Sequence, residues 1–146
     1  MPSLAGQPAQ FLFMQLFLYR EGERKDPQMS PVASRLSNAD LDRLAAFFSV
    51  QKRAAPTHRT APDNAVAGRR LADQHYCTQC HGRELLGQQH IPRLAGQGYA
   101  YLKAQLLAYK ARTRTDPDGA MTTATQALSE GDIDLLSDYL AGLGAP

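Results

Sequence analysis

The sequence predicts an all-α protein, and three observations support that fold class. Apolar residues recur at helical spacing in several stretches of the chain. Ser129 precedes an acidic first turn that contains Asp132, which is a typical helix start. No stretch shows the regular alternation of apolar and polar residues that a strand would need. The length of 146 residues suits one domain or two small ones.

Five segments are expected to be helical. Residues 99–110 carry Leu102, Leu106 and Tyr109 on one face. The final helix begins after Ser129 and stops at Gly142, because glycine commonly follows the last helical turn. The other three expected helices share the same periodicity and cover residues 7–19, 37–48 and 66–76.

The two halves of the chain repeat each other. The block PSLAGQ at residues 2–7 returns as PRLAGQ at residues 92–97. Later matches stay in register with one two-residue insertion, and they pair Tyr19 with Tyr109, Asp26 with Asp116 and Met29 with Met121. Self-similarity of this kind indicates one structural unit used twice.

The repeat predicts three parts in the chain. Residues 65–146 form a complete unit, whereas residues 1–50 form an incomplete copy, because they lack a counterpart of residues 65–91. Residues 51–64 between them contain Pro56 and Pro62 together with threonine and charged residues, so we expect a linker there.

The segment Cys77-Thr78-Gln79-Cys80-His81 opens the complete unit and predicts covalent attachment of haem. Two thiols three positions apart lie about one helical turn from each other. They can therefore form thioethers with the two vinyl groups on one edge of a porphyrin. The histidine that follows can ligate the iron from one face.

Other uses of the two cysteines explain the segment less well. A structural zinc site normally needs four ligands, and the chain has no further cysteine. A thioredoxin-like redox pair follows a strand, whereas residues 66–76 are expected to be helical. A structural disulfide would leave His81 without a role.

The motif, the Pro-x-Leu-Ala-Gly-Gln block and the duplication together resemble the class I cytochromes c, in particular the two-domain dihaem cytochromes c of bacteria. That resemblance covers nearly the whole chain. It implies two cytochrome c-like helical domains that serve as periplasmic electron carriers. Because the first copy has no cysteine or histidine beside Met29, we expect one haem c, in residues 65–146 only.

The expected iron ligands are His81 and Met121. Met121 is the only methionine after the motif and lies in a turn-rich segment that can cross the distal face of the haem. The alternative for Met121 is simple core filling. His90 competes as a ligand but lies only nine positions from His81. The resemblance implies that the Pro92 carbonyl accepts a hydrogen bond from His81, unless Pro92 only ends a loop.

Two filled axial positions predict an electron carrier that is not an enzyme. The expected donor is a dehydrogenase or a quinol-oxidising complex, and the expected acceptor is an oxidase or a reductase. Two alternatives stay open, an electron-relay subunit of a larger redox enzyme and a haem-based gas sensor. The second alternative requires a displaceable sixth ligand.

Composition excludes other classes of function. The 16 basic and 14 acidic residues are scattered, which gives no basis for nucleic-acid binding. No apolar run is long enough for a transmembrane segment. The apolar run at residues 11–19 lacks the flanks of an export signal. Haem is attached to such motifs outside the cytoplasmic membrane, so we expect a periplasmic protein whose export signal is absent from this sequence.

Overall fold

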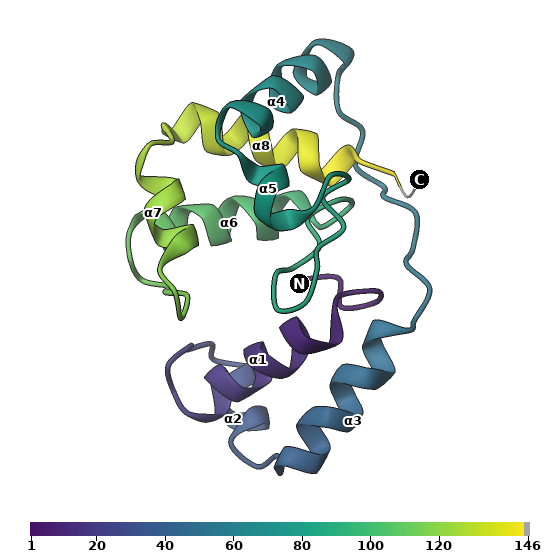
Figure 1. Cartoon of the computed structure of the whole chain (residues 1–146), viewed down its shortest axis with the longest axis vertical. Helices are drawn as coiled ribbons and strands as arrows, with labels where there is room; N and C mark the ends of the chain where they lie inside the picture. The colour runs from purple at the N-terminus through teal and green to yellow at the C-terminus, as the bar shows by residue number, and fades with distance from the viewer. Residues whose placement is uncertain (145–146) are drawn as a thin grey trace. The chain divides into compact units, whose positions relative to one another are not determined.

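The computed structural model describes residues 1–144, and these form eight α-helices in two compact units (Figure 1). The N-terminal unit comprises residues 4–54 and 87–93. The C-terminal unit comprises residues 1–3, 55–86 and those from 94 onward. The described residues contain no strand beyond an isolated bridge between Gln88 and Ile91. The all-α prediction is therefore confirmed.

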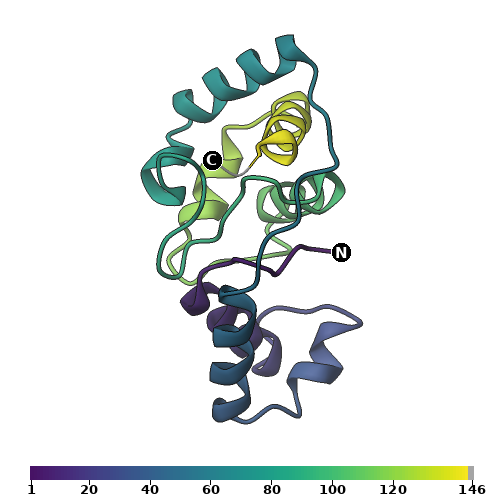
Figure 2. The same cartoon turned by 90° about the vertical axis from the view of Figure 1, so that its right-hand side faces the viewer.

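The N-terminal unit contains helices α1 (Ala9–Arg20), α2 (Met29–Ala33) and α3 (Asn38–Ser49). Helix α1 packs against both of the others, and Figure 2 shows it beside α3. The core of the unit is small and consists of residues contributed by all three helices: Leu12, Leu18, Ala33, Leu41 and Ala45.

The C-terminal unit contains five helices. They are α4 (Pro62–Gln74), α5 (Cys77–His81), α6 (Tyr99–Lys110), α7 (Ala120–Gln126) and α8 (Glu130–Gly142). Helix α8 is central, because both α4 and α6 pack on it. Figures 1 and 2 show α4 crossing over α8. None of the helices within residues 1–144 combines the length and hydrophobicity that spanning a bilayer would require.

Gly68 permits the close crossing of α4 and α8. A Cβ atom at this position would collide with the side chain of Tyr139. Four residues later, Ala72 is buried against Leu136 and Ile133 of α8. Small residues on one face of α4 therefore bring the two helix axes close enough to bury the apolar face of α8.

Equivalent serine residues begin the last helix of each unit. Ser37 and Ser129 each accept a hydrogen bond from the backbone N–H three residues later, and Asp40 and Asp132 accept one in return. These reciprocal bonds satisfy backbone N–H groups that a helix start leaves unpaired. The predicted helix start after Ser129 is confirmed.

The sequence repeat extends to hydrogen bonds. Gly6 and Gly96 both have φ of 67°. Their N–H groups donate to Phe48 and Leu140 respectively, both at 2.9 Å, and these two acceptors lie at equivalent positions near the ends of α3 and α8. A side chain would be strained at φ of this sign, which explains why both copies keep glycine in the block.

The structure corrects two details of the expected helices. The helix expected over residues 66–76 begins at Pro62 and ends at Gln74, because Tyr76 adopts a left-handed conformation with φ of 57°. The segment around Met121, expected to be a loop, turns into α7 at Ala120. Periodicity did not reveal α2, α5 or α7, which have only 5, 5 and 7 residues.

Candidate haem-attachment site

The cysteine motif forms a helix of its own. Helix α5 contains Cys77 to His81 and lies between Tyr76 in the left-handed conformation and Gly82, which has φ of 82°. It packs against α4. The two cysteines therefore lie one helical turn apart, as the spacing predicts, and the sharp turns on either side separate this helix from its neighbours.

The two thiols have different surroundings. Cys77 is half-buried and packs against both apolar clusters of the unit, one around Leu102 and Leu140, the other around Leu136. Cys80 is exposed, and neither cysteine is in a disulfide. Burial raises the pKa of the Cys77 thiol above its usual value. A neutral thioether suits that apolar environment better than a thiolate metal ligand does.

His81 is buried, with 4% of its surface exposed. It ends α5, so its backbone is fixed by the same short helix that carries the cysteines. Helix α5 therefore carries a buried imidazole next to one half-buried and one exposed thiol. The thiols can reach the edge of a porphyrin while the imidazole approaches its iron.

Met121 lies in the first turn of α7, is half-buried and contacts His81. Its N–H group donates to Asp116 Oδ2 at 2.8 Å. Its carbonyl accepts a hydrogen bond from Thr125 Oγ1 at 3.0 Å. The structure therefore brings together the two predicted iron ligands, although they are 40 residues apart in the sequence.

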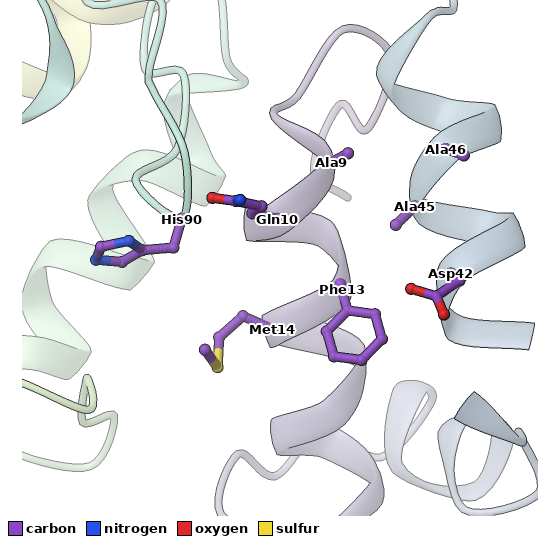
Figure 3. Close-up of a pocket in the computed structure, with 8 residues that line it drawn as sticks. All are labelled: Ala9, Gln10, Phe13, Met14, Asp42, Ala45, Ala46 and His90. Carbon is purple, nitrogen blue, oxygen red and sulfur yellow. The ribbon is translucent and has the colours of Figure 1, made fainter. Parts of the chain in front are cut away.

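His90 and Pro92 lie in the segment 87–93, which belongs to the N-terminal unit. His90 is exposed and lines a groove of about 710 Å³ in that unit, beside Gln10 and Met14 of α1 (Figure 3). Apart from His90, all residues that line the groove belong to α1 or, like Ala45, to α3. Apart from His90 itself, the groove contains none of the predicted ligands, and the role predicted for Pro92 stays a prediction.

The donor atoms fit haem c better than a simple metal ion. Within residues 1–144, no group of three or more His, Cys, Asp or Glu side chains could hold a metal ion. The zinc alternative therefore lacks its ligands in this part of the chain. Two thiols, one buried imidazole and one thioether fit the covalent bonds and the axial ligands of a c-type haem.

Comparison with known proteins agrees with this interpretation. The family model described as cytochrome c matches residues 65–144. The thiosulfate dehydrogenase electron acceptor of Stutzerimonas stutzeri is 34% identical over 161 residues, which cover 98% of this chain and 71% of that protein. Cytochrome c4 of Pseudomonas aeruginosa is 33% identical, with 97% and 75% covered. The crystal structure of reduced cytochrome c4 from Pseudomonas stutzeri superposes with a TM-score of 0.88 at 33% identity, covering 97% of this chain and 84% of that one.

Asp116 and Thr125 are the residues of the site that sequence reasoning missed. The sequence paired Asp116 with Asp26 as a repeat position, but that match carried no information about hydrogen bonding. A signal was nevertheless present, because an aspartate precedes both repeated methionines by a few residues. Aspartate commonly accepts hydrogen bonds from backbone N–H groups that follow it.

Proposed function

Because the chain belongs to the cytochrome c family and is a homologue of cytochrome c4, we propose that it is a periplasmic one-electron carrier with a single covalent haem. Like its cytochrome c4 homologues, it is an electron carrier and not an enzyme. Its cofactor is haem c, attached through the motif Cys77-x-x-Cys80-His81. The observation that carries the proposal is the buried His81 directly after the only pair of cysteines.

The proposed axial ligands are His81 and Met121. Their contact supports this assignment, as does the half-buried position of Met121. We assign the haem to residues 65–146, an incomplete haem-free copy to residues 1–50 and the connection between them to residues 51–64, of which 62–64 already belong to α4. A Pro92 carbonyl that accepts from the His81 ring would fix the orientation of the imidazole.

When bound, the haem supplies a one-electron couple between ferric and ferrous iron. The residues of the chain then have three tasks. His81 and Met121 would ligate the iron and so leave no open position on it for a substrate. The clusters around Leu102 and Leu136, against which Cys77 packs, would keep water away from the ring. Cys77 and Cys80 retain the cofactor covalently in both oxidation states.

The partners of such a carrier are redox enzymes. The Stutzerimonas stutzeri relative is named as an electron acceptor of thiosulfate dehydrogenase. By that likeness, we propose that a dehydrogenase of this type reduces the chain, with a quinol-oxidising complex as the other class of donor. An oxidase or reductase then accepts the electron.

The decisive test measures haem stoichiometry and axial ligation. The chain is fused to a cleavable export signal and produced in a bacterium with c-type cytochrome maturation. We expect one covalent haem per chain and no binding of carbon monoxide to the reduced wild-type protein at neutral pH. Met121→Ala opens the sixth position, so the reduced variant should bind carbon monoxide.

Met29→Ala is the matched control, because Met29 is the repeat partner of Met121 in the unit without cysteines. It should behave as the wild-type protein does. Binding of carbon monoxide to the wild-type protein would support the gas sensor instead. Two haems per chain, or pigment that acidified organic solvent extracts, would contradict the proposal of one covalent haem.

A further inference from the structure

The geometry points to Asp116 and Thr125 as positioning residues for Met121. This inference rests on the proposed ligation by His81 and Met121. We propose that these two side chains hold the backbone of Met121 from both sides, so that its sulfur is presented to the iron at little entropic cost. In this proposal, both side chains act through the backbone of Met121 and not through contact with the haem.

Two aspartates accept hydrogen bonds at the start of α7: Asp118 from the Ala120 N–H at 3.1 Å, and Asp116 from the two residues that follow. The residue before the helix is Gly119, which has φ of 70° and no side chain that could cap the helix. Asp116, three residues before Gly119, accepts hydrogen bonds from the helix start instead. Its Oδ2 accepts from the Met121 N–H at 2.8 Å, and its Oδ1 accepts from the Thr122 N–H at 3.1 Å and from the Thr122 hydroxyl at 2.8 Å. One carboxylate therefore fixes both residues at the beginning of the helix.

Thr125 restrains Met121 from the other side. Its side chain is fully buried, and its hydroxyl donates to the carbonyls of Met121 at 3.0 Å and Thr122 at 3.1 Å. A buried hydroxyl needs such partners, because an unpaired one would cost free energy. Met121 is thus hydrogen-bonded through its N–H and its carbonyl to two side chains of the same unit.

The N-terminal unit provides an internal comparison. Asp26 accepts from the N–H of Met29 at 2.9 Å, as Asp116 does for Met121. The position of Thr125 is occupied there by Ala33, which is also fully buried but has no hydroxyl. The hydroxyl restraint is therefore present only in the unit that has the cysteine motif.

A methionine sulfur binds iron weakly enough for added ligands to compete with it, so restraint of its backbone should affect that competition. Loss of the restraint leaves more conformations to be fixed when the sulfur binds. The probe is imidazole, titrated into the ferric holoprotein at neutral pH and followed by the Soret band. The charge-transfer band of methionine-ligated ferric haem at the red edge of the visible spectrum serves as a second readout.

We expect Asp116→Ala to bind imidazole about tenfold more tightly than the wild type, which corresponds to about 1.4 kcal/mol and to the low end for a hydrogen bond to a charged group. Asp116→Asn keeps one acceptor oxygen and should lie between the two. Thr125→Ala removes a neutral hydrogen bond and should tighten imidazole binding about fivefold. The charge-transfer band should weaken in the same order.

Asp26→Ala is the matched control, because it removes the same kind of hydrogen bond from the unit without cysteines. It should leave imidazole affinity and the band unchanged. If the Asp116 and Thr125 variants behave as Asp26→Ala does, the positioning role is wrong. Met121→Ala separates this failure from failure of the proposed ligation. Equal imidazole affinity in Met121→Ala and wild type would overturn the ligation by Met121 itself, and the positioning role with it.

Discussion

Cys77 and Asp40 show how the surroundings of one side chain set its charge. Burial among apolar side chains raises the pKa of the Cys77 thiol, which favours the neutral form of this sulfur. Asp40 shows the opposite behaviour. The Ser37 hydroxyl, the Ser37 N–H and Arg43 all favour the charged carboxylate and lower the pKa of Asp40 from 3.8 to about 2.

The sign of the effect at Asp40 follows from the two states. Its pKa is lower in the folded than in the unfolded chain, so the bonds stabilise the folded state above pH 3.8 and lose this effect as the pH falls toward 2. Replacement of Ser37 by alanine should raise the pKa of Asp40 toward 3.8. An NMR titration of the Asp40 carboxyl carbon measures this change.

Ser34→Ala is the control for this titration, because the Ser34 hydroxyl donates to the Pro31 carbonyl and makes no contribution to the shift at Asp40. It should leave the pKa of Asp40 low. An Asp40 that titrates at the same pH in Ser37→Ala as in the wild-type protein would show that the cap does not set its charge.

At the scale of helices, the crossing of α4 and α8 determines how the haem-attachment unit is built. Helix α4 leads directly into the cysteine motif, so its position on α8 places α5. Gly68 and Ala72 face α8 and leave room for Tyr139 and Leu136. A small-residue face on the first helix of the unit therefore contributes to the position of the site.

Gly68→Ala should destabilise the C-terminal unit by about 2 kcal/mol, because the added methyl group collides with Tyr139. Alanine has a higher helix propensity than glycine, so propensity alone would predict that this substitution stabilises the unit. Gly131→Ala is the control. It lies in α8, where the nearest atom to the new Cβ is the Ser129 hydroxyl at 3.8 Å, and should stabilise the unit by up to about 1 kcal/mol.

Unfolding in guanidinium chloride, followed by helical circular dichroism, measures both changes in the free energy of unfolding. The opposite signs expected for the two variants make the test specific for packing. If both glycine variants were stabilised alike, the close approach at Gly68 would have no energetic consequence.

For the whole molecule, the two units differ in how well equivalent leucines are covered. Leu136 and Leu128 of the C-terminal unit are 2% and 5% exposed. Their repeat partners Leu44 and Leu36 are only half-buried. Phe47, the partner of Tyr139, is 57% exposed. The difference arises because the N-terminal unit has no counterpart of α4 and α5 among its elements.

The haem should be a major source of stability in the C-terminal unit, since small domains commonly need a covalent or metal staple. We expect Cys77→Ser combined with Cys80→Ser to give a chain without covalent haem whose C-terminal unit no longer unfolds cooperatively. Amide hydrogen exchange measures this, because protection of α6 and α8 should be lost.

Thr78→Ser is the control for this experiment. It lies between the two cysteines and leaves both thiols and His81 in place, so haem attachment and amide protection should be retained. A cooperative melt in the haem-free double variant would contradict the stabilising role of the haem.

Local signals were sufficient for much of the fold. The bounds of α6 were predicted because its apolar residues keep one period over 12 residues. The start of α8 was predicted because the serine cap and its acidic partner are only three residues apart. Helices α2, α5 and α7 were missed because 5 to 7 residues are too few to establish a period.

The sequence by itself determined the chemistry of attachment, since two cysteines and a histidine within five residues need no distant partner to be interpreted. Only the tertiary structure decided what surrounds that chemistry. It showed Gly68 against Tyr139, and Met121 in contact with His81. It also assigned residues 87–93 to the N-terminal unit. The physical reason is that bonds within one or two turns depend on spacing alone, whereas burial depends on which distant elements pack together.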